Sequence, residues 1–288
     1  MLTLLSFAFI ISILVFVHEL GHFMAAKYFG MKVEKFYIGM NLFGLGIEKK
    51  IGETSYGLGL FPLGGYVKIS GIIDESLDDE ASIEQVPFHR QFRSKPAWQK
   101  LIVLSGGVIM NFLLAIFIYS LMFFNSGVQK DPIIENVAEV CGFLDTQKME
   151  SQNVIDDIEK DSVITCPAKL IGFKSGDRIL KINDENILSW EQMTEVIKSN
   201  PNKKISVNWE TIESKQFNGT LVPISSKSFS KGNIIEIGII GITPKLEKIS
   251  IFESIGFGFD RTIKELMQMA YMIKGLVMGS ISLNLLSG

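Results

Sequence analysis

Residues 18–22 read His18-Glu19-Leu20-Gly21-His22, an H-E-x-x-H motif inside an apolar N-terminal segment. On an α-helix, residues four positions apart share a face, so both imidazoles can reach one zinc ion. Zinc lowers the pKa of a bound water to ~7, and a nearby carboxylate can then take its proton during attack on a carbonyl. The motif therefore predicts His18 and His22 as zinc ligands and Glu19 as the catalytic base.

The segment around this motif has the composition of a membrane span. Residues 1–17 contain no charged side chain, and the apolar run continues beyond the motif to Ala26. About 20 apolar residues cross a bilayer as a helix, and no basic residue precedes the run as a signal peptide would require. Since ionisable groups at bilayer depth are costly and functional by default, we expect residues 1–26 to form a retained transmembrane helix that carries the site.

A second transmembrane helix is expected at residues 98–125, within a stretch that has no charge from Leu101 to Gln129. Residues 1–26 contain no Lys or Arg, whereas the next segment, to Lys100, contains ten. The positive-inside rule then places the loop of residues 27–97 in the cytoplasm and the chain after the second span outside.

The second span offers no histidine or carboxylate, although a catalytic zinc normally takes three protein ligands. A third ligand would have to come from another helix. Asn111 is one of its few polar residues, and two interpretations remain open. Its amide can orient a substrate backbone in a dry site, or it can make a helix–helix hydrogen bond, which is common in membranes.

The cytoplasmic loop has two parts. Residues 33–70 are rich in glycine, aromatic and β-branched residues, which predicts short strands and turns. Residues 74–96 are polar and predict a mobile loop, in which the chain's third histidine, His89, would be a solvated surface residue.

The region of residues 131–230 is expected to contain a compact α/β module at about residues 165–225. Residues 178–183 and 204–210 alternate like half-buried strands. Between them, Ser189 followed by Gln192 predicts the start of a helix. Residues 231–288 predict a strand and then an amphipathic helix that leads to a further span.

Composition excludes several other classes of protein. The net charge of −3 and the absence of a recognition motif argue against nucleic-acid binding. Two cysteines are too few for a disulfide scaffold or a cysteine zinc cluster. Outside the cytoplasm Cys141 and Cys166 can form a disulfide, but a pair of free thiols fits the sequence equally well.

These features resemble the site-2 protease family of intramembrane zinc metalloproteases, and in particular its bacterial regulator-of-sigma-E-protease branch. The segment from Pro167 to Ile179 is also similar to the P-A … G-x-x-x-G-D-x-I signature of PDZ domains. Beyond the H-E-L-G-H motif, the matches follow in consistent order over nearly the whole chain: Pro62-Leu63-Gly64-Gly65-Tyr66-Val67-Lys68, Lys95-Pro96-Ala97-Trp98-Gln99-Lys100, Asn111-Phe112-Leu113-Leu114-Ala115, and Pro167-Ala168 through Gly172-Phe173-Lys174-Ser175-Gly176-Asp177-Arg178-Ile179.

The resemblance implies a multi-pass protein of the bacterial cytoplasmic (inner) membrane. Its fold would be an α-helical transmembrane core with a β-rich cytoplasmic loop and an extracytoplasmic PDZ-like α/β domain. It would use zinc to hydrolyse transmembrane segments of single-span proteins, such as anti-sigma factors or signal-peptide remnants. Gly65, Tyr66 and Asn111 would position the substrate, while Gly176 and Asp177 would form a loop of a PDZ-like domain that binds a peptide.

Two departures from the family pattern stand out. Gly106-Gly107 occupies the place of a usual Gly-Pro pair before Asn111. The family's third zinc ligand is the aspartate of an L-D-G motif in a later span, and these 288 residues contain no such motif. The chain is therefore expected to be C-terminally truncated, to hold zinc weakly and to cleave nothing detectable. The alternative function is an inactive, membrane-anchored peptide-binding module, although the intact Glu19 favours a protease.

Overall fold

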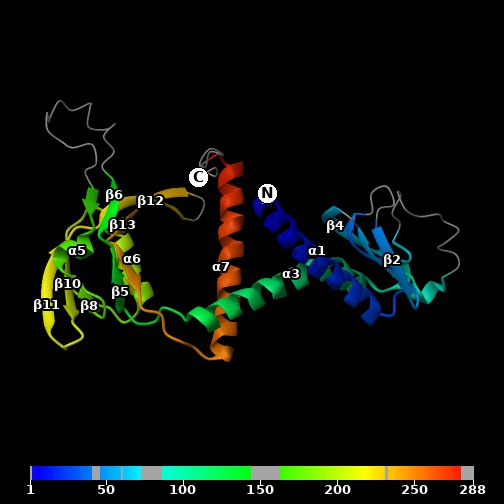
Figure 1. The fold of residues 1–288 in the computed structure, drawn as a ribbon, viewed down its shortest axis with the longest axis horizontal. Helices are drawn as coiled ribbons and strands as arrows, with labels where there is room; N and C mark the ends of the chain where they lie inside the picture. The colour runs from blue at the N-terminus through cyan, green and yellow to red at the C-terminus, as the bar shows by residue number, and fades with distance from the viewer. Residues whose placement is uncertain are drawn as a thin grey trace. The chain divides into compact units, whose positions relative to one another are not determined.

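The computed structural model describes residues 2–40, 46–59, 61–72, 86–143, 163–230 and 233–279. The chain divides into two compact units, one ending at Ile118 and the other beginning at Tyr119. Figure 1 traces the order of the helices and strands along the chain. Most of the polar loop expected at residues 74–96 lies outside the described residues, which resume at residue 86.

Two long apolar helices confirm the helices expected at residues 1–26 and 98–125. They are α1 (Leu2–Tyr28) and α3 (Ala97–Ser126). A left-handed residue, Gly30, follows α1, and α3 begins directly after Pro96. In the described part of the chain only these two helices are long and apolar enough to cross a membrane. Large apolar side chains are exposed along both, which suits contact with lipid.

A four-stranded sheet follows α1, as the composition of residues 33–70 predicts. Its strands are β1 (Val33–Met40), β2 (Gly46–Ile51), β3 (Thr54–Gly59) and β4 (Phe61–Ile69), in the order β2-β3-β1-β4. β1 and β3 are parallel, and the other neighbouring strands are antiparallel. Phe16 and Phe23 of α1 pack edge-to-face on Phe36 of β1, so the helix lies against the sheet. Because β4 is the last strand in this order, it forms an edge of the sheet, and it also contacts α1.

Two short turns, η2 (Phe88–Arg90) and η3 (Phe92–Ser94), join this sheet to the start of α3. The Lys32 N–H donates to the Arg90 carbonyl at 2.9 Å. The Glu53 carboxylate accepts hydrogen bonds from Lys27 and Arg90, which hold its pKa below the usual range. These contacts enclose a small apolar core made of Ala26, Met31, Val33, Ile69 and Val103.

The second unit contains a sheet of the order β11-β10-β8-β9. Its strands are β8 (Arg178–Ile182), β9 (Glu185–Asn186), β10 (Ile205–Glu210) and β11 (Gln216–Leu221). The same unit contains two helices, α5 (Pro167–Ile171) and α6 (Trp190–Lys198). The Ser189 hydroxyl accepts from the Gln192 N–H, which confirms the predicted N-cap.

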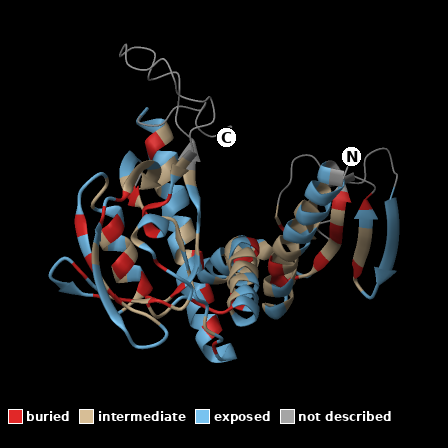
Figure 2. Cartoon of the chain, turned by 60° about the vertical axis from the view of Figure 1, so that its left-hand side comes forward, coloured by how far each residue is buried: buried red, intermediate tan, exposed pale blue. Residues whose placement is uncertain are grey.

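The core of this unit also uses residues on both sides of the expected 165–225 segment. Ile134 comes from β5 (Ile134–Val137), which pairs with β14 (Ile242–Pro244), and Ile240 lies just before β14. Figure 2 shows the buried residues gathered inside the unit. In addition, β6 (Val140–Phe143) pairs with β7 (Val163–Thr165), and a disulfide joins Cys141 to Cys166. The sequence is compatible with either a disulfide or two free thiols, and the structure contains the disulfide.

The C-terminal part of the described chain consists of the hairpin β12 (Ile224–Ser230) and β13 (Asn233–Ile239), then β14 and the long helix α7 (Ile251–Val277). α7 confirms the expected amphipathic helix and begins with a capping box between Ser250 and Glu253. The Ser250 N–H and the Lys130 ammonium stabilise the Glu253 carboxylate and lower its pKa to about 2.

Candidate active site

The two histidines of the motif lie on one face of α1. Their Nε2 atoms are 3.2 Å apart, and the rings meet edge-to-face with centroids separated by 4.9 Å. Two nitrogens that bind one tetrahedral zinc at ~2.0–2.1 Å would lie roughly 3.3 Å apart. The spacing of His18 and His22 therefore fits two ligands of a shared ion.

The other nitrogen of each ring contacts α3. His22 Nδ1 lies 2.7 Å from the Val103 carbonyl oxygen, and His18 Nδ1 lies 3.3 Å from Asn111 Nδ2. A carbonyl can only accept, so His22 donates through Nδ1–H and leaves the lone pair of Nε2 for a metal. Partners of this kind fix the tautomer and orientation of metal-binding histidines. The sequence gives no signal for a backbone acceptor such as Val103.

Three glycines allow the two helices to approach so closely. A Cβ on Gly106 would lie 2.7 Å from the Gly21 carbonyl oxygen, and a Cβ on Gly21 would overlap the Gly106 carbonyl. A Cβ on Gly107 would lie 2.5–2.6 Å from three atoms of the His18 ring. The Gly106-Gly107 pair of α3 is thus the surface against which the motif packs.

Glu19 of α1 is half-buried. A Cβ on Gly65 would lie 3.1 Å from Glu19 Cγ and 2.9 Å from Val15 Cγ1, so β4 passes directly beside the motif. Tyr66, the next residue, stacks on Tyr37 with ring centroids 5.1 Å apart. Of the residues expected to position a substrate, Gly65 therefore lies beside Glu19, whereas the Tyr66 ring packs against another tyrosine of the sheet.

The first unit brings together the two imidazoles that the motif predicts as metal ligands. Among the described residues, no group of three His, Cys, Asp or Glu side chains is placed to hold a metal ion. The two imidazoles fit zinc by donor type, by spacing and by the partners of their Nδ1 atoms.

In the second unit, Gly176 and Asp177 build a turn before β8. Gly176 is left-handed at φ 91°, and the buried Asp177 carboxylate accepts from the Lys174 N–H at 2.9 Å. The Gly176 N–H also donates to the Ile134 carbonyl at 2.8 Å. Both residues thus join β5 to β8 and stabilise the fold of the unit.

An apolar groove of about 250 Å³ lies elsewhere in this unit, between α6 and the segment Gly238–Ile242. We call it the α6 groove, and Thr194 and Ile197 line its helical side. On its other side, the Ala168 N–H donates to the Ile240 carbonyl and the Ala138 N–H to the Gly241 carbonyl. The disulfide sulfurs lie directly against Gly241, whose φ is 82°. The sequence analysis did not identify this groove, because its walls are far apart in the chain.

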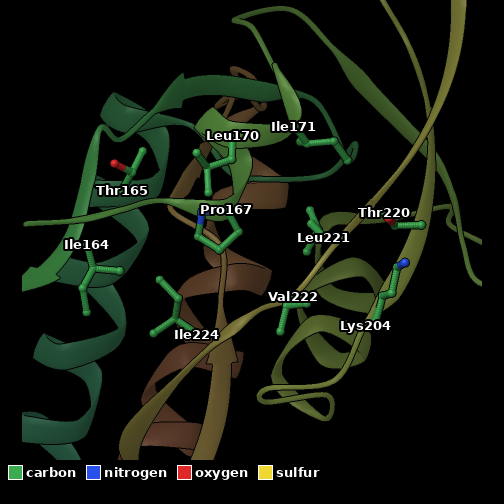
Figure 3. Close-up of a pocket in the computed structure, with 10 residues that line it drawn as sticks. All are labelled: Ile164, Thr165, Pro167, Leu170, Ile171, Lys204, Thr220, Leu221, Val222 and Ile224. Carbon is green, nitrogen blue, oxygen red and sulfur yellow. The ribbon is translucent and has the colours of Figure 1, made fainter. Parts of the chain in front are cut away.

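A second hollow of about 420 Å³ lies between α5 and the β11–β12 segment. Figure 3 shows its apolar lining, which includes Pro167, Leu170 and Ile224, with Lys204 and Thr220 on one side. None of the residues predicted as functional lines this hollow.

An H-E-x-x-H helix of membrane-spanning length, with both histidines in contact with a second such helix, has the arrangement expected of a membrane-associated zinc protease. Residues 6–288 match peptidase family M50, and the chain belongs to this family. Relatives named "Putative zinc metalloprotease" come from Vibrio cholerae and Helicobacter pylori, and another so named comes from Clostridium acetobutylicum. They are 29%, 32% and 31% identical over 99%, 96% and 96% of this chain, and the matches span 78%, 72% and 68% of the relatives. Zinc is the cofactor of this family.

Proposed function

We propose that this protein is an intramembrane zinc endopeptidase that hydrolyses peptide bonds in transmembrane segments of single-span proteins, the chemistry of regulated intramembrane proteolysis. The observation that carries the proposal is the pairing of His18 and His22 on a helix of membrane-spanning length, with Nε2 atoms 3.2 Å apart. Anti-sigma factors and remnant signal peptides are substrates of the required kind.

His18 and His22 would hold the zinc, which polarises a peptide carbonyl and makes water more acidic. Glu19 takes a proton from the attacking water as its oxygen bonds to the carbonyl carbon. The same carboxyl group then passes the proton to the amide nitrogen, and the C–N bond breaks. One water is consumed, and a carboxylate and an amine are released.

A transmembrane substrate must unwind first, because helical carbonyls are hydrogen-bonded and shielded by side chains. β4 can hold the unwound segment, since it is a sheet edge that passes Glu19 at Gly65. An extended peptide that pairs with such an edge gains backbone hydrogen bonds and presents its carbonyls in a fixed register. In this proposal Gly65 is required for close approach, since any side chain there would press on α1.

The proposed location is the bacterial cytoplasmic membrane, with the β1–β4 sheet on the cytoplasmic side and the second unit outside. The distribution of Lys and Arg supports this orientation. The disulfide in the second unit supports it too, because disulfides persist in oxidising compartments.

The second unit is proposed to act as a PDZ-like module that binds an extended peptide in the α6 groove. The groove has the required components, which are an apolar helix face and a backbone segment, Gly238–Ile242, opposite it. Such a module can select which substrates reach the membrane site.

Replacing Thr194 with tryptophan is expected to weaken peptide binding at least tenfold, because the indole fills the α6 groove. Thr194 is half-buried and bonds only to its own helix, so the melting temperature should stay within a few degrees. Binding is measured by fluorescence polarisation with a library of labelled hydrophobic C-terminal peptides. The matched control is Thr220→Trp, which fills the other hollow instead. Equal weakening by both substitutions would contradict the assignment of the groove.

The proposed function is tested by cleavage of a tagged single-span substrate in membranes. The extended chain, defined as these 288 residues followed by a span with an L-D-G aspartate, should cleave the substrate and stop when 1,10-phenanthroline is added. Zinc should restore cleavage, because two imidazoles and a carboxylate complete the usual set of three ligands. Cleavage that persists in excess chelator would argue against the zinc mechanism.

The alternative function, a membrane-anchored peptide-binding module without catalysis, is favoured by one observation. Among the described residues, no group of three potential metal-binding side chains is placed to hold an ion. If peptide binding occurs in the α6 groove but the extended chain cleaves no substrate, this second function is the better description.

A further inference from the structure

One face of α3 meets both histidines of the motif. Val103, Gly107 and Asn111 follow one another at intervals of four, so they share this face. The Val103 carbonyl meets His22 Nδ1, Gly107 lies under the His18 ring, and the Asn111 amide meets His18 Nδ1. The other amide atom, Asn111 Oδ1, is buried and has no hydrogen-bond partner among the described residues.

The polarity of these hydrogen bonds follows from the Val103 end. His22 must donate from Nδ1 to the carbonyl, so neutral His22 has a lone pair on Nε2. The 3.2 Å contact between the two Nε2 atoms is then donated by His18 Nε2–H. That tautomer leaves His18 Nδ1 as an acceptor, and the Asn111 NH₂ group donates to it. All three contacts are therefore consistent with a single direction of donation.

Binding of one ion by both Nε2 atoms requires the other tautomer of His18. Its proton must then reside on Nδ1, which needs an acceptor. A half-turn of the Asn111 amide about its Cβ–Cγ bond places Oδ1 where Nδ2 now lies. Oδ1 thereby gains a partner while the NH₂ group takes the place that Oδ1 leaves, and the contact of 3.3 Å is preserved with reversed polarity.

We propose that Asn111 is a positioning residue for His18, whose amide accepts from Nδ1–H when the histidines share a zinc ion and donates to Nδ1 otherwise. An amide suits this role because it carries a donor and an acceptor of nearly equal size on one rotor. The inference rests on the zinc site of the proposed function, but it does not depend on cleavage. It assigns the amide to the metal ligand and not to the substrate backbone.

The test compares Asn111→Asp and Asn111→Leu in the purified 288-residue chain, with Zn²⁺ affinity measured by competition against a fluorescent chelator. A carboxylate only accepts, so Asn111→Asp should bind zinc at least as tightly as the unaltered chain. Asn111→Leu should weaken binding about 10–100-fold, as loss of such a partner does at other metal sites. The matched control is Asn125→Leu in the same helix, because the Asn125 side chain donates to the Leu121 carbonyl of its own helix. It should leave the affinity unchanged.

A second readout needs no metal. The chain has three histidines, so His89→Gln leaves only the two motif rings visible in ¹⁵N spectra of histidine-labelled protein. His18 should carry its proton on Nε2 in the unaltered chain and on Nδ1 in Asn111→Asp. Equal zinc affinity in Asn111→Leu and the unaltered chain, or an unchanged His18 tautomer in Asn111→Asp, would overturn the proposal. If even the unaltered chain binds no zinc while the tautomer shifts as expected, the zinc site fails and the pairing of Asn111 with His18 stands.

Discussion

Replacing Glu19 with glutamine in the extended chain is expected to lower substrate cleavage about 10²–10⁴-fold while zinc remains bound. This range is what a positioned general base typically contributes. The amide of glutamine has nearly the shape of the carboxyl group but cannot take a proton from water. Glu19 lies beside Gly65 of β4 and is the single carboxylate of the motif, so no other carboxylate of the motif can replace it.

The measurement combines initial rates of cleavage in membranes with the zinc content of the purified protein. Glu213→Gln is the matched control, because Glu213 is an exposed residue of the other unit that pairs with Lys215. His22→Ala should show the opposite pattern and lose zinc as well as activity. Cleavage at the normal rate in Glu19→Gln would refute its assignment as the base.

Replacing Gly21 with alanine is expected to have the second largest effect, although the change adds only one methyl group. The new Cβ would overlap the backbone carbonyl of Gly106, and backbone cannot move aside as a flexible side chain can. Overpacking of this kind typically destabilises a protein by about 1–3 kcal/mol. Separation of the helices also pulls both histidines away from Val103 and Asn111, so zinc affinity should fall together with stability.

Thermal unfolding in detergent and zinc competition would measure both losses. Gly256→Ala is the control, because a Cβ at this position in α7 meets nothing within 4 Å. Alanine is the better helix former, so this substitution should be neutral or stabilise by up to about 1 kcal/mol. A Gly21→Ala protein with unchanged melting and zinc binding would show that α1 and α3 are not in close contact.

The elements that periodicity and local chemistry specify were predictable from the sequence. The apolar runs predict α1 and α3, and Ser189 with Gln192 predicts α6 to within a residue of its observed start. The H-E-x-x-H spacing alone predicts that the two imidazoles share a helix face. Each of these inferences needs only interactions within about four residues of the chain.

Features that depend on distant parts of the chain were not predictable in this way. The Val103 carbonyl is a backbone group, and every residue carries one, so no residue type marks it as the partner of His22. Sequence composition indicated strands at residues 33–70, but not that β1 pairs parallel with β3 and leaves β4 at an edge. The contribution of Ile134 and Ile240 to the core of the second unit depends on the β5–β14 pairing, which joins segments more than 100 residues apart.

The cross-link between Cys141 and Cys166 has a consequence for what happens when the chain is cut. Both cysteines belong to described parts of the second unit, and 25 positions separate them. A host enzyme that severs the backbone anywhere between them leaves two fragments that stay covalently joined. Before reduction, such a nicked molecule migrates on a gel as one species, and Cys166 stays anchored against Gly241 of the α6 groove. The bond therefore gives the second unit a tolerance to nicking that its fold alone does not provide.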